Sequence, residues 1–219
     1  MKAQLVRDLR NGLRTGGGWF HAVYFFAVFA SFMAFAVGPD RGQLSSVAPA
    51  LLWLGTMLAL QLSAADLFAS DYQDDSLRVV LVEQGTLFPY VSAKLVLITL
   101  TSAGPIVLLA PLYFVIFAVE PTSALRAALV FFLGVPTLIL TASVSAALST
   151  GMRTSGLLGA GLSVPVTIPA LIFGVGATRK AMESSQIFSP ELQILCALTL
   201  IFLVIVPPFL IATLKFGLE

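Results

Sequence analysis

Long apolar stretches, each about as long as a helix that crosses a bilayer, constrain this chain more than any other feature. With a window of about 20 residues, which as a helix spans roughly 30 Å of hydrocarbon, the sequence predicts six membrane spans. They lie near residues 19–37, 47–65, 95–118, 124–148, 155–176 and 195–214. No span alternates apolar and polar residues as a lipid-facing barrel strand does, so each is expected to be a helix. The predicted fold class is an all-α membrane protein with a single transmembrane domain over residues 1–219.

The composition excludes several classes of function. Apolar residues make up 58% of the chain and charged residues 11%, which no soluble globular protein of this length shows. A net charge of +1 without a basic stripe argues against a nucleic-acid partner. The sequence has no Gly-x-x-x-x-Gly-Lys-Ser/Thr loop for ATP phosphates, and the single histidine and single cysteine, His21 and Cys196, are too few for a metal site. We therefore predict no catalytic, metal-binding or cofactor-binding residues, and we expect Cys196 to be a small buried hydrophobe.

The positive charges predict the orientation in the membrane, because short cytoplasmic loops carry the excess of lysine and arginine. With both termini inside, the cytoplasmic segments hold Lys2, Arg7, Arg10, Arg14, Arg78, Lys94, Arg153 and Lys215. The other side holds Arg41, Arg126, Arg179 and Lys180. This imbalance favours cytoplasmic N- and C-termini, with the polar segment after the second span on the same side.

Residues 1–18 are predicted to form an amphipathic helix at the membrane interface. Leu5, Leu9 and Leu13 repeat every four residues, and arginines lie on the other side of that helix. The TGGG sequence at 15–18 then permits a sharp turn into the first span. The alternative is a cleaved signal peptide with a small-residue site at 34–36.

The most polar segment of the chain, residues 66–85, is predicted to be a cytoplasmic helix that docks against another protein. Ser70 and Gln73 have the spacing of a capping box, and Asp74 lies four residues before Arg78. An apolar face of Leu77, Val80 and Leu81 is expected to pack on the bundle while the charged face meets the partner. A solvated loop is the alternative interpretation. The candidate coupling residues are Asp71, Gln73, Asp74, Asp75, Leu77 and Arg78.

The predicted spans contain many helix-distorting residues. Kinks are expected at Pro105, Pro111, Pro136, Pro165, Pro169 and Pro207-Pro208. Gly156, Gly159, Gly161 and Ser163 offer a smooth face for close helix approach. Ordinary packing and a part in a substrate path are both compatible with this pattern.

His21 and Pro190 each allow a more specific interpretation. His21, near the inner interface, could be an axial haem ligand or simply a histidine at headgroup depth, and the only partners in view are methionines such as Met33 and Met57. On the far side, Pro190 after Ser189 predicts the start of a helix after the external segment 177–194.

The layout resembles the transmembrane subunit of an ABC-2-type ABC transporter. A sharper resemblance comes from particular strings, among them VGPD at 37–40, APALLWLGTMLA at 48–59, LFASDYQDDSL at 67–77 and AKL at 93–95. Further strings are PIVLLAPL at 105–112, FLGVPTL at 132–138, ALSTGMRTSGLL at 147–158, VPVTIPALIFGVGA at 164–177 and IATLKFGLE at 211–219. Together they are similar to the CcmB family, the haem exporter permease of cytochrome c maturation. The chain differs from the family pattern at Ser76, where glycine is usual, and at Arg78, where an acidic residue is common.

The resemblance implies a non-catalytic subunit of the bacterial inner membrane that works with an ATP-hydrolysing CcmA-like partner. It also implies a homodimer within a complex that includes CcmC-like and CcmD-like subunits and the haem chaperone CcmE. Closure of the ATPase dimer would push on residues 70–83 and tilt the attached helices. Haem would be handled by the wider complex. The alternatives are an ABC-2-type exporter of lipid, polysaccharide or drug, and a membrane scaffold or secondary carrier that needs no ATPase.

Overall fold

A computed structural model describes residues 19–65, 67–151, 157–184 and 188–217. Every regular element in these ranges is helical, as the all-α prediction requires. The predicted interfacial helix at 1–18, Arg153 and Gly156 lie outside the described residues, and only the backbone is described at Gly159, Gly161 and Ser163.

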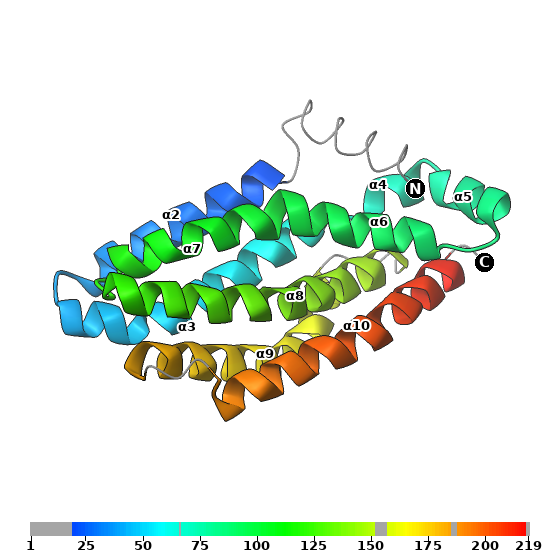
Figure 1. The fold of residues 1–219 in the computed structure, drawn as a ribbon. Coiled ribbons are helices and arrows are strands. Elements are labelled where there is room, and N and C mark those ends of the chain that lie inside the picture. The colour runs from blue at the N-terminus through cyan, green and yellow to red at the C-terminus, as the bar shows by residue number, and fades with distance from the viewer. Residues whose placement is uncertain (1–18, 66, 152–156, 185–187, 218–219) are drawn as a thin grey trace.

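Each predicted span falls on a helix, or on a series of helices that follow one another directly (Figure 1). The elements in chain order are α2 (Trp19–Val37), α3 (Arg41–Ala64), α4 (Ala69–Gln73), α5 (Ser76–Gln84), α6 (Phe88–Ile98), the π-helix η1 (Thr99–Ala103), α7 (Gly104–Ile116), α8 (Pro121–Gly151), α9 (Leu157–Glu183) and α10 (Pro190–Phe216). The helices extend beyond several of the predicted spans because apolar residues do not mark the point where a helix leaves the membrane.

Four membrane-crossing helices are evident in the described residues by length and composition. They are α3, the α6–η1–α7 series, α8 and α10, and a shorter apolar helix covers His21–Val37. The chain is therefore a multi-pass membrane protein. The count of six spans stays a prediction.

Helix α8 lies at the centre of the bundle. It packs against α3, α7, α9 and α10, and it is the most buried of the four membrane-crossing helices, whereas α10 is the most exposed. In Figure 1, α2 and α7 lie on one side of α8 and α9 and α10 on the other. Much of the buried apolar surface of the protein is thus arranged around α8.

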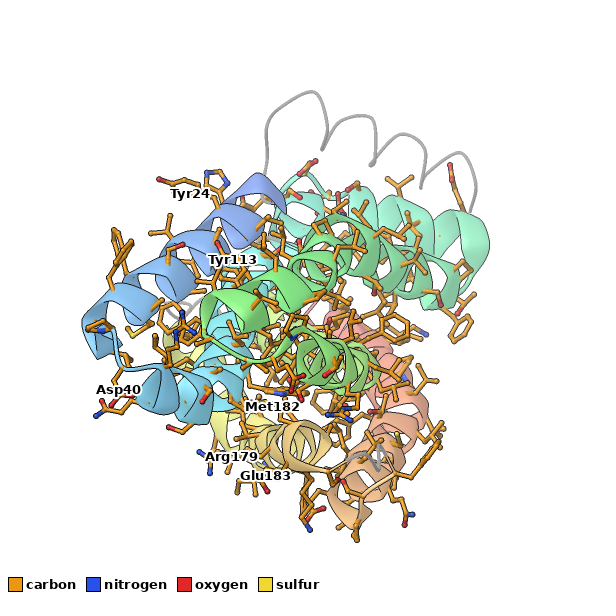
Figure 2. All side chains as sticks on the ribbon, turned by 60° about the vertical axis from the view of Figure 1, so that its left-hand side comes forward. Tyr24, Asp40, Tyr113, Arg179, Met182 and Glu183 are labelled. Carbon is orange, nitrogen blue, oxygen red and sulfur yellow. The ribbon has the colours of Figure 1, made fainter. Side chains whose placement is uncertain are left out.

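Polar side chains cap two of the helices that begin at the far end of the bundle from α4 and α5. Asp40 Oδ1 accepts a hydrogen bond from the backbone N–H of Gly42 at 2.8 Å, at the start of α3. Ser189 Oγ accepts one from Leu192 N–H at 3.2 Å, which confirms the helix start predicted at Pro190. In Figure 2, which turns this end of the bundle forward, Asp40 lies near the α2–α3 turn and Glu183 at the end of α9.

The series α6–η1–α7, in which kinks are predicted at Pro105 and Pro111, contains a π-helix that the sequence did not predict. Five residues, Thr99–Ala103, form a π-helix directly before Gly104 and Pro105. Ser102 Oγ lies 2.6 Å from Ser63 Oγ of α3, so the π-helix is tied to the neighbouring helix. The other prolines at which kinks were predicted all lie inside helices, namely Pro111, Pro136, Pro165, Pro169, Pro207 and Pro208.

Cys196 differs from its prediction. Its side chain is half-buried against the core because α10, on which it lies, exposes most of its length.

Candidate functional site

The polar segment after α3 forms two short helices, α4 and α5, at one end of the bundle (Figure 1). The predicted single helix is wrong, because the chain breaks at Asp74 and Asp75, and Asp75 has a φ of 57°. Aspartate tolerates this left-handed conformation better than most residues. Ser76 Oγ donates to the carbonyl of Asp71 at 3.1 Å across the break. We call residues 69–84 the elbow.

The predicted capping box is also wrong. Phe68 occupies the N-cap position of α4, and Ser70 lies inside the helix. Phe68 is fully buried and its ring lies 6.2 Å from that of Tyr90, so packing of this aromatic side chain places the start of α4.

The apolar face predicted for this segment is confirmed. Leu77 is completely buried, Val80 is 8% exposed, and Leu81 packs on the core cluster. Spacings of three and four residues put these side chains on one face of α5. Leu77 therefore holds α5 to the bundle.

The outer side of the break carries four of the predicted coupling residues. Gln73, Asp74, Asp75 and Arg78 are all exposed. Arg78 forms an ion pair with Asp75, with Nε–Oδ1 at 3.6 Å. Exposed pairs of this kind add little stability, so the Asp75–Arg78 pair does not hold the elbow to the bundle.

Asp71, the sixth predicted residue, points in the opposite direction. Its Oδ2 lies 2.6 Å from Lys94 Nζ and accepts a hydrogen bond from Tyr90 Oη at 2.6 Å. Only 17% of the Asp71 side chain and 10% of the Lys94 side chain are exposed. The six candidates thus divide into an exposed set and two residues, Asp71 and Leu77, that face the protein.

A groove of about 350 Å³ runs along the exposed face of α5 and is lined by Arg78, Val79, Val82 and Glu83. Val79 is 53% and Val82 84% exposed, which is unusual for apolar side chains on so polar a segment. These two valines were not among the predicted coupling residues. The available signal was the spacing of each valine from a charged residue of the groove. Val82 lies four residues after Arg78, and Val79 lies four residues before Glu83.

The elbow is also tied to the end of α10. Tyr72 Oη donates a hydrogen bond to the carbonyl of Gly217 at 2.6 Å. The elbow and the C-terminal end of α10 therefore lie at the same end of the bundle (Figure 1).

The other predicted positions are separate from this site. His21 is exposed near the start of α2, while Met33 and Met57 are half-buried on α2 and α3. No three histidine, cysteine or acidic side chains gather as metal ligands within the described ranges. On the far end, Lys180 Nζ pairs with Glu191 Oε1 at 2.7 Å, joining α9 to α10.

Comparisons with known proteins cover almost the whole chain. A family model described as "CcmB protein" matches residues 1–216. A protein of Bradyrhizobium diazoefficiens described as "Heme exporter protein B" is 36% identical over 100% of this chain and 99% of its own length. Proteins with the same description are 34% identical in Paracoccus denitrificans, over 100% of both chains, and 33% identical in Pseudomonas aeruginosa, over 96% of this chain and 94% of the relative.

Proposed function

Because the chain belongs to the CcmB family, we propose that it is the membrane subunit of an ABC transporter for haem export in cytochrome c maturation. The relatives described as "Heme exporter protein B" match nearly end to end, which supports the same role here. An exporter of lipid, polysaccharide or drug is not favoured. The chain is a non-catalytic subunit, and ATP hydrolysis belongs to a separate CcmA-like subunit.

The exposed face of the elbow is the docking surface for that ATPase. The observation that carries this assignment is the division of α5 into two faces. Leu77 and Val80 attach the helix to the bundle, and the other face presents Val79 and Val82 beside charged residues. Buried apolar contacts inside a rim of charge are what a protein partner requires.

Closure of the ATPase pushes on this surface and moves the helices that the elbow contacts. A displacement changes the equilibrium between two states of the membrane subunit only if the ATPase binds the two states with different affinity. The groove beside Val82 supplies apolar area for that difference, and Asp74, Asp75 and Arg78 supply charge complementarity.

The protein lies in the bacterial inner membrane with six spans and both termini in the cytoplasm. The position of the elbow beside the end of α10 supports a common side for these two regions. Two copies form a homodimer in a complex with a CcmA-like dimer and with CcmC-like and CcmD-like subunits, and the complex frees haem-loaded CcmE.

Charge reversal tests the docking surface. We expect the double substitution Asp74→Lys and Asp75→Lys to abolish co-purification of the ATPase subunit, because like charges across an interface repel. Val82→Asp should have the same effect by placing a charge in the apolar groove. Glu120→Lys, an exposed reversal between α7 and α8, is the matched control. ATPase recovery equal to the unmodified chain in all three variants would refute the docking surface.

A further inference from the structure

The inward-facing carboxylate of Asp71 connects the elbow to the membrane helix α6. Its Oδ2 contacts both Lys94 Nζ and Tyr90 Oη at 2.6 Å. Tyr90 and Lys94 are four residues apart, so they lie on the same face of α6. The Lys94 ammonium also lies 5.6 Å from the centre of the Tyr90 ring, within the range of a cation–π interaction. We call these three residues the Asp71 joint.

The Asp71 joint is a stiff connection. Charge-assisted hydrogen bonds are shorter and stronger than neutral ones. Because the Asp71 and Lys94 side chains are largely withdrawn from solvent, breaking this pair costs far more than breaking an exposed pair. The contrast with the Asp75–Arg78 pair on the outer side of the same elbow is direct, since both of those side chains are mostly exposed.

The helix on the other side of the joint, α6, leads into an irregular segment. The π-helix η1 begins at Thr99, five residues after Lys94, and is followed by Gly104 and Pro105. Thr99 Oγ1 donates to the Leu95 carbonyl at 2.7 Å, a side-chain bond that competes with the regular backbone ladder. Short π-helical segments and proline are points at which a helix changes direction.

The neighbouring residue gives the elbow a second attachment. Tyr72 bonds the Gly217 carbonyl beyond α10. Consecutive residues of α4 thus hold α6 and the end of α10, and a displacement of the elbow acts on both helices.

We propose that Asp71 is a positioning residue of the coupling site. It does not contact the ATPase; it passes displacement of the elbow through Lys94 and Tyr90 to α6, which bends at η1. This inference rests on the proposed function and assigns two different roles to residues of the elbow. Asp74, Asp75, Val79 and Val82 bind the partner, and Asp71 transmits the movement.

The test compares binding with output in the assembled complex. Asp71→Asn keeps the size of the side chain and removes its charge. We expect the ATPase subunit to co-purify as with the unmodified chain. Holocytochrome c formed per ATP hydrolysed should fall by about 5-fold or more, within the usual range of coupling between sites. Lys94→Met should give the same result as Asp71→Asn, with unchanged co-purification and reduced output. Tyr90→Phe, which keeps the ion pair, should lose less.

The charge swap Asp71→Lys with Lys94→Asp distinguishes the ion pair from a general structural role. Partial recovery of output relative to Asp71→Asn is expected, because the pair is restored with reversed polarity. Lys94→Arg, the conservative variant, should keep most of the output and serves if the swap does not assemble. Glu120→Gln, at the far end of the bundle, is the control for loss of a carboxylate.

The outcomes separate this inference from the proposed function. Loss of ATPase co-purification in Asp71→Asn would place Asp71 on the docking surface and overturn the inference, leaving the function intact. Unchanged output in Asp71→Asn, or no recovery in the charge swap, would also overturn it. If neither the reversals at Asp74 and Asp75 nor Asp71→Asn affects co-purification or output, the docking surface itself is wrong.

Discussion

Trp53 sets how closely α3 can approach α8 and α9. Its buried indole lies against Gly134 of α8 and Gly174 of α9, and a Cβ atom at either glycine would collide with the ring. The indole N–H donates a hydrogen bond to Thr178 Oγ1 at 2.9 Å. The centroid of the Trp53 ring lies 5.1 Å from that of the Phe131 ring, in an edge-to-face arrangement. The packing of three helices therefore depends on the absence of a methyl group at two positions.

Gly174→Ala should destabilise the protein. The added Cβ would lie 2.7 Å from Trp53 Cη2, and the indole has no room to move because it is fully buried. Overpacking of this kind costs about 1–3 kcal/mol. A lower thermal unfolding midpoint in detergent is the expected measurement.

Gly176→Ala is the matched control for that prediction. Its nearest neighbour would be Glu191 Cγ at 3.4 Å, an ordinary contact with a flexible side chain. The gain in helix propensity should leave the midpoint unchanged or slightly raised. Equal midpoints for the two alanine variants would contradict the tight fit at Gly174.

Thr178→Val should also lower the midpoint, by a different mechanism. Valine has nearly the same shape as threonine but cannot accept the Trp53 N–H, so a buried donor is left unpaired at a cost of about 1–3 kcal/mol. Thr178→Ser retains the acceptor and should be milder. The Trp53 hydrogen bond is unimportant if Val and Ser variants unfold at the same temperature.

At the scale of elements, the elbow shows which parts of a site can be predicted from sequence. The spacing of Leu77, Val80 and Leu81 was enough to predict the buried face of α5, because local periodicity determines it. The direction of Asp71 was not predictable, since it depends on Tyr90 and Lys94, which lie on a later helix. The charged face was predicted from the charges alone, and it therefore included Asp71.

The break within the elbow and the π-helix escaped prediction for related reasons. Asp75 carries only a weak local signal for a positive φ, because glycine is the usual residue at such positions and aspartate a less common one. Pro105 predicted a distortion in the third span, but the π-helix at 99–103 is also tied to α3 by Ser63 and Ser102. Tertiary contacts of this kind leave no periodic pattern in the sequence.

The contact between α3 and η1 can be tested with a disulfide. In a Cys196→Ala background, Ser63→Cys with Ser102→Cys should cross-link on mild oxidation, because the native hydroxyl oxygens lie 2.6 Å apart. A gel-mobility shift reversed by reductant is the measurement. The pair Ser63→Cys with Leu100→Cys should not cross-link, since Leu100 is 59% exposed. Equal yields for both pairs would contradict the π-helical register.

The two ends of the bundle carry different charged groups. The elbow presents Asp74, Asp75 and Arg78 at one end. Arg179 and Glu183 lie at the other end, which comes forward in Figure 2. Between them, α8 spans 31 residues. At about 1.5 Å per residue this exceeds a hydrocarbon core of about 30 Å, so the two ends should lie on opposite sides of the membrane.

Cysteine labelling checks that arrangement and the orientation predicted from the positive charges. In a Cys196→Ala background, Glu183→Cys should react with a membrane-impermeant maleimide added to intact spheroplasts, because it is exposed on the side predicted to face the periplasm. Val82→Cys, 84% exposed on the elbow, should react only after the membrane is permeabilised. The reverse pattern would place the elbow away from the cytoplasmic ATPase and remove the basis for coupling. Labelling of both cysteine variants from outside would refute a bundle that spans the membrane along α8.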